Sequence, residues 1–400
     1  MKILLLLTQS LDSPGGGGRF FPIAKALAYH GHQVTVVALH HDFVNCKQRS
    51  FRLDGVDVHY VAQMHVHKSN NTKTYYSTPK LLWLVLLATW WLTWHALKHR
   101  ADVIHVCKAQ PMNLVASYAA HLLKRTPVFV DSDDLEAVNN HFSSRWQQKV
   151  VAAFENWPIS FVSGITTHTS FLRNHYIQLG YPEGQIQLVA LGVDRQSFMV
   201  ESNTMQLKQK LDIPNDAKVI VYVGSMSLTN HPIDMLLQSF MTVVEAVPDA
   251  FLLLVGSGEN FDELQQLASQ LGLADQTLFV GRIPREDVVH YYRLGLVSVD
   301  PRRDTLLAES SLSLKIVESL ASGVPVVSTD IGDREQLVAD AGIVVPPDDS
   351  AELANALITF LQDDQLRAAY TEAAQRTSES HYWDQRILDF VKVYRSELDT

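Results

Sequence analysis

Acidic side chains gather directly after one apolar run in the first half of the chain. Asp131, Asp133 and Asp134 follow the run Pro127–Val130, which has the composition of a buried strand. Residues that follow a strand of a parallel sheet lie at its carboxyl edge, where functional groups concentrate. The pattern favours one carboxylate that contacts a substrate or acts as a base. Two alternatives stay open: carboxylates that hold Mg²⁺ or Mn²⁺ beside a diphosphate, and carboxylates that cap a helix.

A second chemical pattern lies in the segment 300–347. Lys315–Ser322 is expected to be a helix that ends at Gly323, and Glu318 lies in its middle among apolar neighbours. A buried carboxylate needs a partner, which here is either a sugar or ribose diol or a structural ion pair. Ser311–Leu314 is expected to form the first turn of this helix. The free N–H groups of such a turn attract a diphosphate, and Lys315 would add positive charge.

Four consecutive glycines, Gly15–Gly18, precede a helix that is expected to begin near Arg19. Glycines let a backbone approach a ligand closely, and a helix N-terminus attracts anions. A dinucleotide site for NAD or FAD is the competing interpretation, but Phe20 stands where that fingerprint has its third glycine and the loop before it is long. The third interpretation is a flexible loop that binds no ligand.

These side chains must be positioned by two α/β domains. Short apolar runs alternate with helical stretches, which predicts parallel sheets covered on both faces. The first block contains the expected strands Ile3–Leu7, Gln33–Leu39, Val56–Val61, Asp102–Val106, Pro127–Val130 and Gly164–Thr167. The second contains Lys218–Val223, Phe251–Val255, Thr277–Val280, Leu296–Val299 and Val324–Ser328. We place the domains at 1–195 and 196–380, with a linker region in Asp194–Asn215 and a final helix in 381–400 that is expected to pack back on the first domain. The site is expected in the cleft between the two sheets.

Composition narrows the class of protein. The chain has 400 residues and a net charge of −10, whereas a bulk nucleic-acid binder is more often basic, so no nucleic-acid partner is expected. Its two cysteines exclude a disulfide framework and fit a reducing compartment. The histidines show no zinc spacing, and no resident metal is expected.

One predicted helix, Leu81–Leu97, carries four of the seven tryptophans, with Trp83, Leu87, Trp90 and Trp94 on one face. The segment Val61–Val130 around it has eight basic residues and one acidic residue, so it is locally cationic in an acidic protein. Three interpretations compete: a helix that lies on an anionic membrane surface, a buried core helix and a membrane-spanning helix. We favour the first, through residues 80–100.

The ordered set of motifs resembles the GT-B-fold glycosyltransferases of family four. The motifs are GHQVTVVA at 31–38, ADVIHV at 101–106, LGVDRQSF at 191–198, VYVGS at 221–225, LLLVGSGE at 252–259, VGRIPREDVVHYY at 280–292 and VESLASGVPVVST at 317–329. The resemblance covers nearly the whole chain. It implies two Rossmann-like doubly wound domains facing across a cleft, with an acceptor on the first domain and a nucleotide-sugar donor on the second.

The resemblance also implies roles for single residues. Glu318 is expected to bind the donor ribose, Gly281 and Arg282 to lie near the base, and Gly17 to approach the donor from the first domain. The expected donor-binding set is Gly17, Ser225, Gly256, Gly258, Arg282, Ser313, Leu314, Lys315 and Glu318. The expected catalytic residues are Asp133, where the family has a histidine, and Glu309, one residue from the family's second glutamate. Ser225 stands where the family has an arginine that clamps the diphosphate, and Asn230 or His231 stands where it has a lysine.

Together these patterns predict a glycosyltransferase that moves a sugar from a UDP-, GDP- or dTDP-linked donor to a hydroxyl of a glycan or lipid-linked acceptor. The resemblance implies retention of configuration, and no metal or other cofactor is expected. The protein is expected to be cytoplasmic and peripheral on the inner face of the membrane. The alternatives are a catalytically reduced member of the same fold that acts as a binding subunit, and an NAD-dependent oxidoreductase.

Overall fold

Contacts within the computed structural model divide the chain into two units, Met1–Ala190 with Trp383–Thr400, and Leu191–Tyr382. The structure describes residues 1–13, 15–69, 72–139, 144–229 and 231–398. The chain leaves the first unit at Ala190 and re-enters it at Trp383, a few residues from the expected boundaries at 195 and 380. The two predicted parallel-sheet α/β domains are confirmed.

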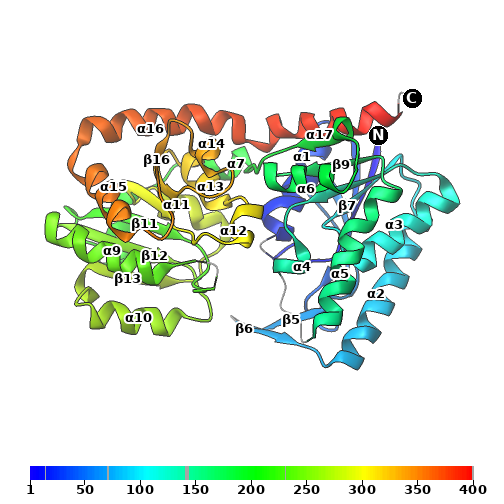
Figure 1. The fold of residues 1–400 in the computed structure, drawn as a ribbon, viewed down its shortest axis with the longest axis horizontal. Coiled ribbons are helices and arrows are strands. Elements are labelled where there is room, and N and C mark those ends of the chain that lie inside the picture. Colours follow the sequence, from blue (N-terminus) through cyan, green and yellow to red (C-terminus); the bar gives the residue numbers. More distant parts are fainter. Residues whose placement is uncertain (14, 70–71, 140–143, 230, 399–400) are drawn as a thin grey trace. The chain divides into compact units, whose positions relative to one another are not determined.

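The first unit is built on an eight-stranded sheet with the order β10-β9-β8-β7-β1-β2-β4-β3 (Figure 1). Every neighbouring pair is parallel except β3 with β4. The strands are β1 (Lys2–Leu7), β2 (Gln33–His40), β3 (Ser50–Leu53), β4 (Val56–Gln63), β7 (Val103–Cys107), β8 (Val128–Ser132), β9 (Gly164–Thr167) and β10 (Ile186–Leu188). A separate antiparallel pair consists of β5 (Val66–Ser69) and β6 (Thr72–Tyr75).

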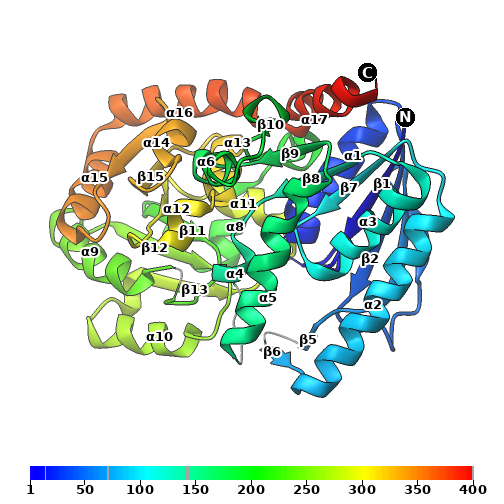
Figure 2. The ribbon, with the colours of Figure 1, turned by 45° about the vertical axis from the view of Figure 1, so that its right-hand side comes forward.

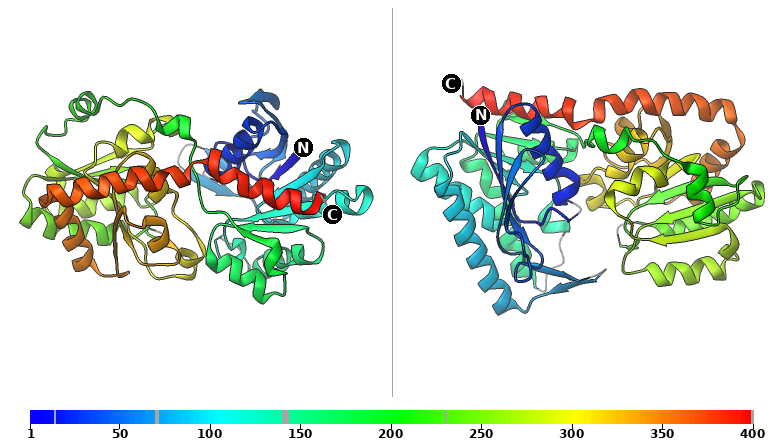
Figure 3. Two further views of the ribbon diagram at one scale, coloured as in Figure 1. Left: turned by 90° about the horizontal axis from the view of Figure 1, so that it is seen from above. Right: turned by 180° about the vertical axis from the view of Figure 1, so that it is seen from behind.

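Helices cover both faces of this sheet because successive side chains of a strand point to opposite faces. Ile3, Leu5 and Leu7 of β1 pack with α1 (Phe21–Tyr29) and α17 (Trp383–Leu398), which lie side by side in Figure 3. Leu4 and Leu6 pack into a second core with α2 (Thr78–Lys98) and α3 (Pro111–Lys124). The remaining helices are α4 (Glu136–Asn139), α5 (Arg145–Asn156) and α6 (Ser170–Gln178).

The second unit has a six-stranded, all-parallel sheet with the order β13-β12-β11-β14-β15-β16. Its strands are β11 (Lys218–Val223), β12 (Ala250–Val255), β13 (Thr277–Gly281), β14 (Val297–Asp300), β15 (Val326–Thr329) and β16 (Gly342–Val345). Its helices are α7 (Arg195–Phe198), α8 (Thr204–Lys210), α9 (Ile233–Ala246), α10 (Phe261–Gln270), α11 (Val288–Tyr292), α12 (Leu306–Ser310), α13 (Leu314–Ala321), α14 (Arg334–Val338), α15 (Ser350–Gln362) and α16 (Asp364–Ser378). Ile220 and Tyr222 of β11 enter the core under α9 and α15, while Val219 and Val221 enter the core on the opposite face.

Several local expectations were wrong. The expected linker Asp194–Asn215 contains α7 and α8, and Leu207 of α8 packs against the core of the second unit. The helix expected to begin near Arg19 begins three residues earlier with a π-helical turn, Gly16–Phe20. Ser311 is extended rather than helical, so α13 begins only at Leu314.

Candidate functional site

A buried carboxylate surrounded by three cations lies at the carboxyl edge of the second unit's sheet. Asp300, the last residue of β14, is fully buried. Its Oδ1 is 2.8 Å from Nζ of Lys315 and 3.7 Å from Nε of Arg302, and its Oδ2 is 3.6 Å from Nε of Arg334. Burial alone would raise the pKa of Asp300, but these three cations outweigh it and hold the pKa well below its usual range. We call these four residues the Asp300 cluster, and it carries two more positive than negative charges.

Lys315 is the cation of the Asp300 cluster whose charge is easiest to remove. Burial and the charge of Arg302 lower the pKa of its ammonium to about 8, although Asp300 opposes both. Its Nζ also lies 5.6 Å from the ring centre of Tyr222 and 3.4 Å from Nδ1 of His231. The ammonium therefore titrates within about one unit above neutral pH.

Gly224, directly after β11, makes room for the Lys315 side chain. A Cβ atom at Gly224 would lie 2.4 Å from Cε of Lys315. His231 also contacts Lys315, and its imidazole is kept neutral because burial lowers its pKa well below the usual value. His231 therefore does not supply the charge of the lysine that the family has in this region, and Asn230 lies outside the described residues.

The glycines expected to line the donor pocket allow two loops to pack backbone against backbone. Gly256 has φ +137°, and a Cβ there would lie 1.8 Å from the carbonyl oxygen of Gly224. A Cβ at Gly258 would lie 2.3 Å from the carbonyl oxygen of Met226, whose N–H donates to Ser257 O over 3.2 Å. Their packing role is thus explained, and their contact with a donor stays a prediction.

Glu318 lies on α13, three residues after Lys315, and is buried as the sequence predicts. Its Oε1 accepts a hydrogen bond of 3.3 Å from Nη2 of Arg285. Burial raises the pKa of Glu318, and Arg285 and Lys315 oppose that shift. The structure thus contains the ion pair that was one of the two expected partners of this carboxylate.

The other predicted donor residues of this unit follow the strands β11 and β13, which flank β12 in the sheet, or lie at the start of α13. Ser225 follows β11 and Arg282 follows β13, and both are exposed. Ser313 is the N-cap of α13, and its Oγ is buried with no hydrogen-bond partner in the described part of the chain. Leu314 is the first residue of the helix. Glu309, a predicted catalytic residue, lies exposed on α12.

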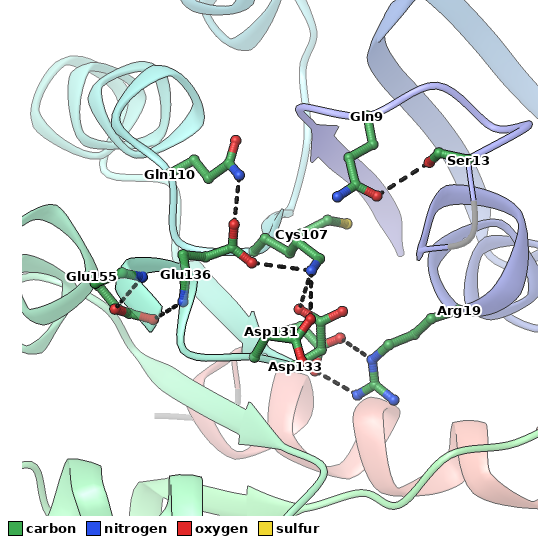
Figure 4. Close-up of polar contacts among 12 residues, drawn as sticks. Gln9, Ser13, Arg19, Cys107, Gln110, Asp131, Asp133, Glu136 and Glu155 are labelled. Atoms are coloured by element: carbon green, nitrogen blue, oxygen red, sulfur yellow. Dashed lines mark hydrogen bonds and ion pairs between the residues drawn. The ribbon is translucent and has the colours of Figure 1, made fainter. Parts of the chain in front are cut away.

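The first unit carries a second polar group, at the carboxyl edge of β7 and β8 (Figure 4). Nζ of Lys108 lies 3.2 Å from Oδ1 of Asp133, 3.0 Å from Oδ2 of Asp134 and 3.0 Å from Oε1 of Glu136. Gln110 donates to the other oxygen of Glu136 over 2.7 Å. We call Lys108, Asp133, Asp134 and Glu136 the Lys108 cluster.

The Lys108 cluster has three carboxylates and one cation, and the pKa of one of these carboxylates, Asp133, is raised. Burial raises the pKa of Asp133 to about 8; Lys108 opposes the shift, and Asp134 and Glu136 reinforce it. Glu155 on α5 accepts hydrogen bonds from the N–H groups of Glu136 and Ala137, yet burial raises its pKa to about 7. Asp133 therefore keeps its proton to a higher pH than an ordinary aspartate, and it can accept a proton only where the solution is alkaline enough to ionise it.

Asp131 has a structural role that separates it from Asp133. Both of its oxygens accept 2.8 Å hydrogen bonds from Arg19, and Oδ1 also accepts one of 2.7 Å from Thr166. Arg19 follows the glycine run, in which a Cβ at Gly17 would lie 2.4 Å from the carbonyl oxygen of Leu11. Gly17 therefore lets this loop fold closely on itself, and its contact with a donor stays a prediction.

Sequence reasoning missed the residues that complete both clusters. Asp300, Arg302 and Arg334 were not singled out, although Asp300 follows an apolar strand in the way that Asp131 does. Lys108 follows the predicted strand 102–106 and has a positive φ of 65°. A charged residue directly after an apolar strand was the available signal in both units.

Comparison with known proteins identifies the family. Residues 203–377 match the glycosyl transferases group 1, and residues 15–192 match the glycosyl transferase 4-like domain. Both halves of the chain thus match glycosyl transferase families, and together the two matches cover most of its length. The family resemblance found in the sequence motifs is thereby confirmed.

Curated relatives match about half of the chain. A D-inositol 3-phosphate glycosyltransferase of Corynebacterium urealyticum is 32% identical over 233 residues, which cover 55% of this chain and 54% of the relative. A phosphatidyl-myo-inositol mannosyltransferase of Mycolicibacterium smegmatis is 30% identical over 185 residues, 46% of each chain. The chain thus spans about half the length of the curated relatives it matches.

Solved structures match the chain over nearly its whole length and show the same fold. Sucrose-phosphate synthase of Thermosynechococcus elongatus has a TM-score of 0.76 at 19% identity and covers 100% of both chains. HepE of Anabaena, in complex with UDP and glucose, has a TM-score of 0.71 at 20% identity and covers 97% of this chain and 99% of its own. The predicted GT-B fold is confirmed.

Proposed function

We propose that this protein transfers a sugar from a nucleotide-sugar donor to an acceptor hydroxyl. The Asp300 cluster carries this proposal, because it combines an excess of positive charge with the start of α13 at one carboxyl edge of the sheet. The relatives named as glycosyltransferases, and the HepE structure with UDP and glucose, support it.

The departing nucleoside diphosphate is the species that needs stabilisation during transfer. Lys315 and Arg302 would supply charge to it, and the N–H groups at the start of α13 would supply hydrogen bonds. This arrangement replaces the arginine and lysine that the family has near Ser225 and His231. Glu318 would bind the ribose hydroxyls by exchanging its Arg285 partner for them, which requires only that the exposed Arg285 side chain moves.

We further propose a transfer that needs no metal and retains the configuration of the sugar. Among the described residues, Asp133, Asp134 and Glu136 could together hold a metal ion, but the ammonium of Lys108 contacts all three carboxylates and supplies the cation. A second such group, Asp12, His40 and His41, is more exposed. Retention rests on the family resemblance alone.

For the acceptor side we propose Asp133 as the residue that contacts the acceptor hydroxyl and accepts its proton. Its raised pKa makes it a stronger base than an ordinary aspartate, provided that the solution is alkaline enough to ionise it. Glu309 is proposed as a second residue that contacts the donor sugar. We propose a glycan or lipid-linked polysaccharide precursor as acceptor and the cytoplasmic side of a membrane as location.

Isothermal titration with UDP-, GDP- and dTDP-sugars and with NAD(H) tests this proposal. We expect one sugar nucleotide to bind and Arg302→Ala to weaken its binding at least about tenfold, as loss of a charge-assisted contact should. The matched control is Arg303→Ala, because Arg303 is exposed and pairs with Asp234 and Asp348 instead of Asp300.

Two outcomes would replace the proposal. Binding of a sugar nucleotide without turnover on any glycan or lipid-linked acceptor would favour a reduced, non-catalytic member of the family, consistent with Ser225 in the arginine position. Binding of NAD(H) alone would favour an oxidoreductase.

A further inference from the structure

Helix α2 exposes a ridge of large apolar side chains between Leu82 and Trp94. Trp83 is 65% exposed, Trp90 66% and Trp94 53%. Their spacing of seven and four residues places them on one side of the helix. Further exposed apolar residues of the same helix are Leu82, Leu86, Leu87 and Trp91. An exposed apolar surface of this kind on a folded domain marks an interaction site.

The opposite face of α2 is anchored in the first unit. Ala88, Leu92 and Ala96 are fully buried and belong to the core that α2 shares with α3 and the sheet. Figures 1 and 2 both show α2 beside α3, in agreement with their many close contacts. Helix α2 is therefore neither a fully buried core helix nor a free one, and the core-helix interpretation is wrong.

Basic residues stand at both ends of this ridge. Lys80 is exposed in the first turn, and Lys98 and Arg100 are exposed at the far end, while α2 itself has no Asp or Glu. Lys124 lies beside that end, because its Nζ donates to the carbonyl oxygen of His99 over 2.8 Å. Burial and the charge of Arg100 lower the pKa of Lys124, in keeping with crowded positive charge at this corner.

We propose that the exposed face of α2 docks on the surface of an anionic lipid bilayer. Tryptophan side chains favour the boundary between headgroups and acyl chains, because their rings are apolar and carry one N–H donor. A helix lying in that boundary buries its apolar face to a depth of roughly 5–10 Å, and cations at its flanks then reach anionic headgroups. The ridge and its flanking cations supply both contributions on one helix.

The observations disfavour the two other occupants of this face. A second copy of the chain would pair α2 with itself, and since α2 has no acidic side chain, its cations would meet apolar or cationic groups rather than carboxylates. A spanning arrangement is suggested by length and composition, since α2 has 21 residues and is the one candidate span found in the described residues. Spanning would require Ala88, Leu92 and Ala96 to leave the core that they share with α3.

Flotation of the full chain with vesicles tests the proposal without any donor, so its outcome is separate from that of the sugar-transfer proposal. We expect binding to vesicles of phosphatidylcholine with phosphatidylglycerol at low salt and much weaker binding to phosphatidylcholine alone. The double variant Trp83→Ala/Trp90→Ala should lower the partition coefficient at least about tenfold. The control is Tyr29→Ala, which removes an exposed aromatic ring from α1.

A charge-reversal pair tests the flanking cations. Lys98→Glu/Arg100→Glu should abolish the preference for anionic vesicles, whereas Lys210→Glu/Lys392→Glu, the same charge change at exposed sites outside this surface, should leave it unchanged. All of these substitutions are at exposed positions, so we expect the fold to stay intact. A thermal unfolding temperature close to that of the parental protein checks this for each variant.

Three results would overturn the proposal. The first is an absence of binding to anionic vesicles at low salt. The second is a dimer in sedimentation that dissociates in Trp83→Ala/Trp90→Ala, which would assign the face to a second copy. The third is resistance of bound protein to alkaline carbonate extraction, which would indicate a spanning helix.

Discussion

Replacing Lys315 by methionine removes the ammonium that lies 2.8 Å from Asp300 and keeps an unbranched apolar side chain in its place. Asp300 retains Arg302 and Arg334, so the substitution leaves no buried carboxylate without a cation. What is lost is one positive charge for a bound diphosphate. A charge-assisted hydrogen bond contributes about 1.5–3 kcal/mol, which corresponds to a Kd for UDP that rises about 10- to 150-fold.

The pKa of Lys315 adds a pH signature that distinguishes this role from a general loss of packing. Because burial lowers this pKa to about 8, the ammonium is about nine-tenths charged at pH 7 and about one-tenth charged at pH 9. If only the charged form binds, the affinity of the parental protein for UDP falls about tenfold over that range. Lys315→Met should be weak and insensitive to pH, and Lys315→Arg should also be insensitive, because arginine stays charged.

Isothermal titration of UDP at several pH values measures these effects, with GDP and dTDP in parallel. Lys210→Met is the matched control, because Lys210 is an exposed lysine on α8. Two results would refute the reasoning: a parental affinity that does not change between about pH 7 and pH 9, or a Lys315→Met variant that binds within about twofold of the parent.

Three further perturbations test other parts of the two units. Asp133→Asn should lower the transfer rate at least about a hundredfold, and the rate should no longer rise with pH below about 8. Profiles of transfer rate against pH measure both effects, and an unchanged profile contradicts a role as base. Glu318→Ala should weaken donor binding by about 1–3 kcal/mol in titrations, and equal affinity in a folded variant excludes the ribose contact. Gly256→Ala should lower the free energy of unfolding in urea by more than about 2 kcal/mol, because the added Cβ would overlap the carbonyl oxygen of Gly224. The control Gly272→Ala should have a smaller effect, because its Cβ would meet no atom within 4 Å.

The sequence was most informative where a local pattern decides the outcome. Apolar runs with β-branched residues predicted interior strands such as Lys218–Val223, and the apolar neighbours of Glu318 predicted its burial. Arg302 lies two residues after Asp300, but the other two cations, Lys315 and Arg334, come from separate segments and could not be predicted in this way. Only the packing of α13 and α14 against the sheet brings these two to the carboxylate.

The same limitation applies to the contacts between distant residues in the first unit. Arg19 and Asp131 are 112 residues apart, and no spacing rule connects them. The raised pKa of Asp133 likewise depends on Lys108, on Glu136 and on burial, which become known only from the tertiary structure. Sequence patterns therefore located the edges at which functional groups gather, and the structure showed which of those groups are in contact.

Helix α17 has a consequence for how the protein is made. Trp383, Phe390 and Tyr394 of this helix are fully buried in the core that contains β1 and α1, and the ring of Trp383 lies 5.7 Å from the guanidinium of Arg19. A ribosome releases these residues only after the entire segment Leu191–Tyr382. During synthesis the first unit must therefore wait with an open apolar face, and a nascent chain arrested before Trp383 should be more sensitive to protease in its first unit than the completed chain.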